Sequence, residues 1–130
     1  MSSPNTQIYN NTIYMSGQFP WAIEYRFSGS QNIALANNLT NKALMARDGA
    51  TGTQSNNVTN ASSGWFKTLA GGDLHLASSI TEVIDRGKAM TGLSDDFDGQ
   101  PRPSGAGIDV GADEYGSAVV PLAPTDVRAD

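Results

Sequence analysis

The residues of this sequence best suited to chemistry are acids that gather near its carboxyl end. Asp96, Asp98 and Gly99 stand at the third, fifth and sixth positions of an EF-hand calcium loop, in which carboxylate oxygens surround a hard cation. The first and twelfth positions would be Ser94 and Gly105, which carry no carboxylate. A regular EF-hand is therefore excluded, and a looser calcium site stays open. Its candidate ligands are Asp95, Asp96, Asp98 and Asp109.

The stretch that holds these acids, residues 95–116, also has a structural interpretation, which we favour. A carboxylate in a tight turn accepts backbone N–H groups, and glycines such as Gly111 allow positive φ. Two prolines flank Arg102 and hold it in an extended arm, where we expect it to bridge to Asp98 or Asp109 rather than to bind a substrate. Arg102 and Gly111 are thus predicted to be structural residues.

Catalysis is another interpretation of the charged side chains, and no motif selects residues for it. Paired carboxylates hydrolyse glycosidic bonds, whereas a polysaccharide lyase needs a basic side chain and a cation. His75 is the only histidine, so a multi-histidine metal site is excluded, and we expect a surface or partly packed position beside two leucines. We assign no catalytic residue. The side chains available are the acids Glu24, Asp48, Asp73 and Asp85 and the bases Arg26, Lys42 and Lys67.

Three aromatic residues, Trp21, Tyr25 and Trp65, are candidates for contact with carbohydrate. Exposed aromatic rings can stack on sugar rings, although aromatic residues at strand spacing more often belong to a core. Apolar residues alternate with Ala22, Glu24 and Arg26 over residues 21–27, which predicts a strand with one buried face.

The composition excludes several classes of function. The chain has 130 residues, which suits one domain, and its 13 acidic and 8 basic residues give a net charge of -5. An acidic chain is a poor partner for nucleic acid or for an anionic membrane surface. Without cysteine there are no disulfides and no thiolate sites. No segment approaches the ~20 apolar residues of a membrane span.

Paired asparagines form a loose repeat in the first half of the chain. The pairs stand at positions 10–11, 37–38 and 56–57, so they are 27 and then 19 residues apart. Asparagine tolerates the left-handed region where a flattened coil turns sharply, and stacked asparagines can bond along a ladder. The repeat therefore predicts stacked turns of short strands with loops of unequal length. The predicted structural residues are Asn11, Asn38 and Asn57.

One short helix is predicted between residues 79 and 87. Ser79 and Glu82 match a capping box, and Gly87 stands where a glycine would end the helix. Two turns cannot be stable alone, so we expect this helix to pack across the open end of the coil.

Two further stretches carry a resemblance to a known family. Residues 98–103, DGQPRP, and 107–115, GIDVGADEY, resemble the closing signature of secreted right-handed parallel β-helix proteins, many of which are polysaccharide lyases or related surface proteins. Residues 74–87 are similar to the element that precedes that signature, with departures at Glu82 and Arg86. The resemblance implies an all-β, right-handed parallel β-helix (solenoid) with few rungs. We expect rungs over 1–72, a closing segment containing the short helix over 73–116, and a linker over 117–130.

The function implied is that of a non-catalytic, C-terminal part of an extracellular or cell-surface protein, with a structural capping role and contact with polysaccharide. No signal peptide begins the chain, so we expect a piece of a longer protein. Two alternatives stay open: a polysaccharide lyase or glycoside hydrolase, and a calcium-stabilised adhesin or oligomerisation module. We expect no cofactor unless calcium binds, no nucleic-acid or membrane partner, and self-association through an exposed end of the solenoid.

Overall fold

Short β-strands make up most of the regular structure. The computed structural model describes residues 2–116, and the linker expected at 117–130 lies outside them. Within the described residues there is no α-helix, and no helical segment has the length and apolarity to cross a membrane. The elements are β1 Gln7–Tyr9, β2 Thr12–Ile13, β3 Trp21–Arg26, β4 Ile33–Ala36, β5 Leu39–Thr40, β6 Ala43–Arg47, β7 Gly52–Ser55, η1 Ser63–Trp65, β8 Phe66–Thr68, η2 Leu69–Gly71 and β9 Asp73–Leu76.

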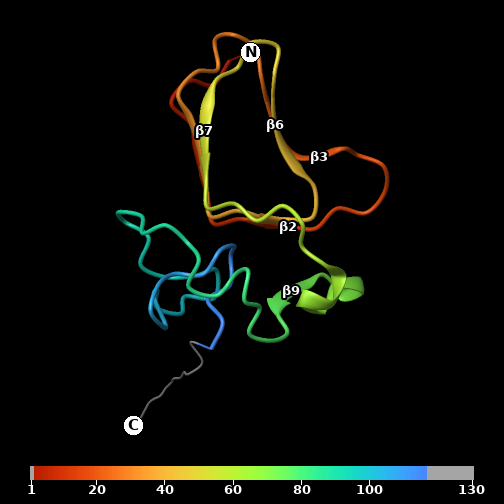
Figure 1. The fold of residues 1–130 in the computed structure, drawn as a ribbon, viewed down its shortest axis with the longest axis vertical. Helices are drawn as coiled ribbons and strands as arrows, with labels where there is room; N and C mark the ends of the chain where they lie inside the picture. Colours follow the sequence, from red (N-terminus) through yellow and green to blue (C-terminus); the bar gives the residue numbers. More distant parts are fainter. Residues whose placement is uncertain (1, 117–130) are drawn as a thin grey trace.

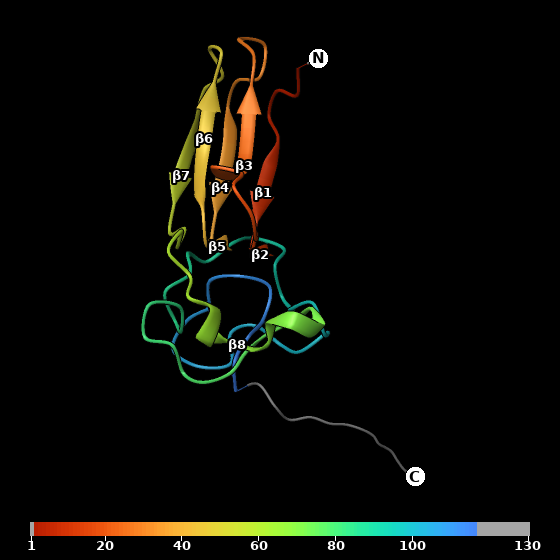
Figure 2. The ribbon, with the colours of Figure 1, turned by 90° about the vertical axis from the view of Figure 1, so that its right-hand side faces the viewer.

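The chain runs through three small parallel sheets in the same order twice. Strands β1, β2 and β3 pair in parallel with β4, β5 and β6, and β7 then joins the first sheet beside β4. Val58 makes a further parallel bridge to Leu39, so part of a third turn follows. Figure 1 looks along this stack, and Figure 2 shows its strands side by side. Residues 7–58 are called the coil below.

The spacing of the asparagine pairs reappears in the pairing of the strands. Thr12 lies opposite Leu39, and Ile33 lies opposite Gly52, so successive turns are offset by the same two separations as the asparagines. The longer first turn carries residues 14–20 between β2 and β3, where the second turn has only residues 41–42. The prediction of an all-β chain is confirmed, and its strands are mostly parallel. The sheets are short and do not form a closed solenoid.

Two groups of apolar side chains form the core. The first lies in the coil around Ile33, Leu35 and Leu44, and the alternation along β3 turns Ile23 and Tyr25 towards it. The second group joins the coil to the rest of the chain, because Leu39 of β5 belongs to it. Its buried members are Leu39, Ala61, Phe66, Leu76, Val83 and Val110.

Residues 73–116, called the closing segment below, lie against the β2 and β5 side of the coil (Figure 1). The Gly111 amide donates to the Asn37 carbonyl at 2.7 Å, and the Ala112 amide donates to Oγ1 of Thr12 at 2.8 Å. Gly111 has a φ of 96°, and a Cβ there would come within 2.7 Å of Thr12 Oγ1 and 3.0 Å of Leu39 Cβ. The prediction that residues 79–87 pack across the end of the coil is therefore wrong, because the whole segment docks on its side.

The short helix predicted over residues 79–87 is also wrong, and a single turn stands in its place. The Val83 and Ile84 amides both donate to the Ile80 carbonyl, but Asp85 then adopts a φ of 59° and the helix cannot continue. The Asp85 amide donates to the Asp109 carboxylate at 2.8 Å, and the Gly87 amide donates to the Ile108 carbonyl. Bonds to the segment 108–110 thus replace the bonds that a second helical turn would make.

The second asparagine of each pair forms a ladder along the coil. The backbone and side-chain amides of Asn11 both donate to Oδ1 of Asn38, at 3.1 and 3.0 Å. The same two groups of Asn38 donate to Oδ1 of Asn57, at 2.9 and 3.0 Å. Asn38 is completely buried, so the ladder satisfies polar groups that water cannot reach.

The first asparagine of each pair serves the junction with the closing segment. Asn10, Asn37 and Asn56 have φ values of 55°, 61° and 55°, the left-handed conformation expected at the corners of the coil. Their side-chain amides donate to carbonyls of the closing segment, one from each successive turn of the coil. The acceptors are the carbonyls of Asp109 and Gly111 for Asn10, of Lys88 for Asn37 and of Arg86 for Asn56.

Candidate functional site

The candidate site is centred on His75 in strand β9. Residues two apart on a strand share a face, so Asp73 and His75 lie together while Leu76 is buried in the core. Oδ1 of Asp73 accepts the backbone amide of His75 at 3.0 Å and contacts its Nδ1 at 2.5 Å. Asp73 thereby holds the ring so that Nε2 faces away from the strand.

Asp98 reaches His75 from a turn that Asp96 builds. Oδ1 of the buried Asp96 accepts the amides of Asp98 and Gln100, both at 2.9 Å, and its Oδ2 accepts the Glu114 amide at 2.9 Å. The turn places Oδ2 of Asp98 at 2.5 Å from Nε2 of His75. A carboxylate with no role at the site itself therefore positions one that lies in it.

Asp113 approaches the same histidine from the far end of the closing segment. Its Oδ2 accepts the Leu76 amide at 2.8 Å, which fixes the carboxylate beside strand β9. His75, Asp98 and Asp113 offer one ligand atom each, and these three atoms lie within 4.8 Å of one another. Three segments of the chain thus meet at one imidazole.

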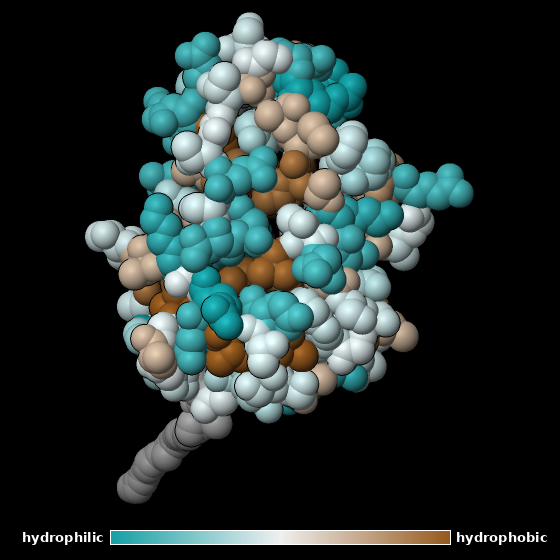
Figure 3. All heavy atoms as spheres, in the orientation of Figure 1, coloured by the Kyte–Doolittle hydropathy of each residue, from teal (hydrophilic) through white to brown (hydrophobic). Residues whose placement is uncertain are grey.

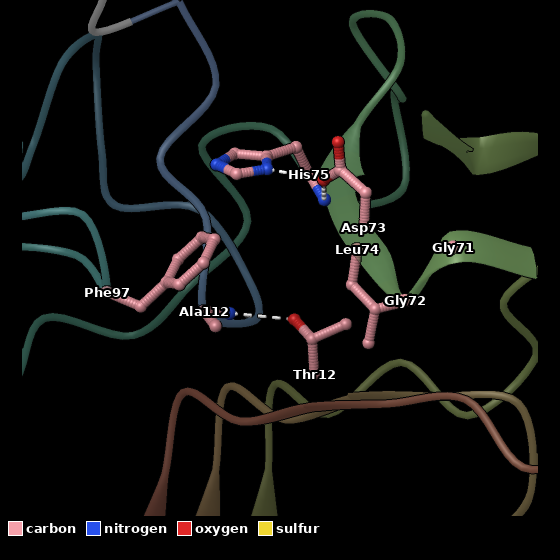
Figure 4. A pocket seen from close by; sticks show the side chains of 8 residues that line it. All are labelled: Thr12, Gly71, Gly72, Asp73, Leu74, His75, Phe97 and Ala112. Carbon is pink, nitrogen blue, oxygen red and sulfur yellow. Dashed lines mark hydrogen bonds and ion pairs between the residues drawn. The ribbon is translucent and has the colours of Figure 1, made fainter. Parts of the chain in front are cut away.

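Two cavities adjoin His75, with volumes of about 450 and 430 Å³. Figure 4 shows the first, in which Asp73 and His75 face Phe97 across the opening and Thr12 of the coil lies beneath. The Phe97 ring lies 4.8 Å from the His75 ring, between centroids, and Phe97 is 55% exposed. The second cavity is more polar and is lined by Lys67, His75, Leu76, Asp98, Gln100, Asp113, Glu114, Tyr115 and Gly116.

The charges at the site shift one another's proton affinities. The hydrogen bonds to Asp73 and Asp98 raise the pKa of His75 above its ordinary value, because they favour the imidazolium. The hydrogen bond to His75 lowers the pKa of Asp73, and burial raises the pKa of Asp113. Three carboxylates therefore surround a single cationic ring, and the site carries net negative charge.

This arrangement is suited to holding a cation or the hydroxyl groups of a ligand. Both ring nitrogens of His75 are engaged by carboxylates. The one hydroxyl that lines the cavity of Figure 4, Oγ1 of Thr12, accepts the Ala112 amide. The described residues around His75 thus supply acids and a base, and the geometry of a serine or threonine nucleophile beside a histidine is not formed there.

Of the four calcium ligands predicted from the sequence, only Asp98 belongs to this group. Asp96 and Asp109 are buried and accept backbone amides, in the case of Asp109 those of Asp85 and Tyr115. Asp95 is exposed, and its carbonyl accepts Nε of Arg102. The predicted set is therefore not brought together around one point.

Arg102 lies at the centre of the closing segment with its side chain only 2% exposed. Its guanidinium pairs with the buried Glu114 carboxylate at 3.1 Å and donates to the main-chain carbonyls of Asp95, Asp109, Gly111 and Ala112. The bridge expected to a carboxylate of Asp98 or Asp109 goes instead to Glu114. Arg102 gathers the backbone of residues 95–114 around one buried charge.

The aromatic candidates for sugar contact lie apart from one another and from His75. Tyr25 packs on the core of the coil, and Trp65 packs on the core of the closing segment. Trp21 is partly buried at the start of β3. None of the three lines either cavity beside His75.

Most of the candidate catalytic side chains lie on the coil, away from the site. Arg26 pairs with Asp48 and Arg47 with Glu24 on the coil, and Nζ of Lys42 donates to the Gly17 carbonyl. Of the acids and bases considered, only Asp73 and Lys67 line a cavity at His75.

Sequence reasoning missed His75 and Asp113 as site residues. One local signal was present, since the alternation in Asp73, Leu74, His75 and Leu76 puts the acid and the histidine on one face of a strand. No local signal could have placed Asp98 and Asp113 beside them, because they are 23 and 38 positions further along the chain than His75.

Comparison with known proteins identifies no relative: no family model, no curated protein and no solved structure matches this chain. The interpretation of the site therefore rests on its own residues.

Proposed function

We propose that this chain is a structural, carbohydrate-contacting part of an extracellular or cell-surface protein, built as a few rungs of a right-handed parallel β-helix with a closing segment. Two features support the architecture: the three sheets are visited in a fixed order, and the asparagine ladder links successive turns. The handedness and the cellular location come from the resemblance of residues 98–115 to the closing signature of secreted β-helix proteins.

The observation that carries sugar contact is the exposed Phe97 ring beside His75 and Asp73. An aromatic face next to polar groups suits a saccharide, because its ring has apolar C–H faces and an equatorial rim of hydroxyls. Gln100 and Tyr115 line the adjoining cavity and could offer further hydrogen bonds to a second sugar unit. The proposal moves the contact from the three aromatic residues predicted from the sequence to Phe97.

The test is binding of uronate-containing and neutral oligosaccharides, measured by calorimetry on wild type, F97A and F19A. Phe19 is a matched control because it is also exposed, at 67%, and lies in the loop of the coil at residues 14–20. We expect at least one saccharide to bind, with affinity about tenfold weaker in F97A, as for the loss of a modest stacking contact, and unchanged in F19A. No binding across the panel, or equal loss in both variants, would contradict the proposal.

An enzymatic alternative is favoured by one observation, the presence of Lys67 beside His75 in the second cavity. A lyase uses a basic side chain to remove the proton next to a uronate carboxylate. Turnover on the same oligosaccharides decides between the two functions, since a binding module leaves their chain lengths unchanged.

A further inference from the structure

We propose that His75, Asp98 and Asp113 bind a divalent transition-metal ion, for which Zn²⁺ is the appropriate probe. This inference does not depend on the sugar proposal. Imidazole nitrogen and carboxylate oxygen are both common ligands of such ions. The three ligand atoms already lie within 4.8 Å of one another, on segments that are held independently by backbone hydrogen bonds.

Asp73 supplies the outer contact that histidine ligands of metals usually have. A metal-bound imidazole commonly binds through one nitrogen and donates its other N–H to a carboxylate, which fixes the ring orientation. Nδ1 of His75 lies 2.5 Å from Oδ1 of Asp73, so Nε2 is the nitrogen that faces Asp98. The ring is therefore oriented for a ligand at Nε2 before any ion binds.

Asp113 provides a second, independent indication of a ligand. It is only 6% exposed, and its Oδ2 accepts the Leu76 amide. No described residue donates a hydrogen bond to its other oxygen, which belongs to a carboxylate that lines the second cavity. A buried carboxylate oxygen without a donor is costly, and a bound cation would satisfy it.

The donor set favours a transition metal over the calcium considered from the sequence. Calcium takes six to eight oxygen ligands, whereas this site offers one nitrogen and two carboxylates. Tetrahedral bonds of ~2.1 Å need ligand atoms ~3.4 Å apart. Nε2 of His75 and Oδ2 of Asp98, now 2.5 Å apart, would therefore separate by about 1 Å, and Asp113 would approach.

The ion would take the place of the proton shared by His75 and Asp98, and that proton would pass to solvent. Three protein ligands leave a coordination position open, and that position would face the cavity of about 430 Å³. Water or an oxygen of a bound molecule would complete the coordination there.

The test measures Zn²⁺ binding by calorimetry, with no affinity tag left on the protein, and follows coordination through the visible spectrum of a Co²⁺ substitute. We compare wild type with H75Q and D98N. D95N is the matched control, because Asp95 is an exposed acid of the same turn that lies outside the group of three. We expect affinity at least tenfold weaker in H75Q and in D98N, unchanged affinity in D95N, and a higher melting temperature with Zn²⁺ for wild type and D95N only.

Circular dichroism without metal shows whether each variant is folded, and D98N removes a ligand from an exposed turn if H75Q does not fold. Absence of Zn²⁺ binding to wild type would overturn the proposal. Equal weakening in D95N and D98N would do the same, because it would indicate nonspecific attraction to acidic groups. Stabilisation by Ca²⁺ without Zn²⁺ binding would replace it with an oxygen-only site.

Discussion

The coil and the closing segment satisfy their buried polar groups in different ways. In the coil, the same residue type recurs at each turn, so Asn38 accepts from Asn11 and donates to Asn57 in one repeating pattern. In the closing segment, each buried polar side chain has its own set of partners, and Arg102 alone joins residues from 95 to 114. Repetition makes the coil readable from sequence, whereas the single-use contacts of the closing segment create the irregular surface on which the candidate site lies.

The two regions also differ in how their apolar interior is protected. Figure 3 shows hydrophobic atoms between the polar atoms in the middle of the coil, at the end that faces the viewer. The closing segment covers a side of the coil instead, through the core that contains Leu39 and Val110. Covering a side stabilises the corners of all three turns but leaves the ends of the stack open to association.

The largest effect is expected from removing the buried charge of the closing segment. R102M leaves the Glu114 carboxylate, with its side chain 1% exposed, without its ion-pair partner. Breaking one side of a buried pair costs about 3–5 kcal/mol, so the free energy of unfolding should fall by about that amount. Urea denaturation measures it. The matched variant R26M removes an exposed pair with Asp48 and should cost less than ~1 kcal/mol.

If R102M and R26M cost the same, the closing segment is not organised around its buried charge and the contrast with the coil fails. Hydrogen exchange sharpens the comparison, because in R102M the amides of residues 95–114 should lose protection before those of β4.

The next largest effect is expected in the ladder of the coil. N38A removes the acceptor of two Asn11 amides and the donor to Asn57 and to the Ile8 carbonyl, all at a fully buried position. Unsatisfied buried groups cost about 1–3 kcal/mol each, and relaxation should limit the total to about 3 kcal/mol. Thermal and urea unfolding should agree. N60A, at an exposed asparagine, should change stability by less than ~0.5 kcal/mol, and a larger change would show that asparagine content rather than the ladder matters.

The smallest expected effect is a pH dependence that arises from Asp109. Burial raises the pKa of Asp109 from 3.8 to about 6, although its carboxylate accepts the Asp85 and Tyr115 amides. A raised folded-state pKa means that the protonated form is favoured by folding. Stability from this group is thus complete below about pH 4 and is lost as the pH rises through about 6, by at most about 3 kcal/mol.

The measurement is the urea midpoint from pH 4 to 7 for wild type and D109N. The variant has no titrating group at this position, so the decrease with pH should be smaller than in wild type. Because the pKa values of His75 and Asp113 are also raised, part of the decrease should remain in D109N. Identical pH profiles for the two proteins would show that Asp109 does not titrate in this range.

The contrast between the regions also explains what the sequence could predict. The asparagine pairs and the alternation around Ile23 report local geometry that recurs, so the all-β class and the offsets between turns follow from them. The capping box at Ser79 is an equally good local signal, but Asp85 bonds to Asp109, 24 positions away, and the helix does not form. The site at His75 depends on three such distant segments, and no periodic pattern in the sequence encodes their meeting.

The ladder of asparagines has a direction. Each step runs from the amides of one turn to the side-chain oxygen of the next, so Oδ1 of Asn11 receives no hydrogen bond from a described residue. An additional strand laid on β1 with an asparagine in register would gain two hydrogen bonds at that oxygen, and at the opposite end Asn57 would have to act as the donor. Lengthening this protein by design is therefore a polar operation, in which a unit copied from the 19-residue turn adds to each end through a different chemical group.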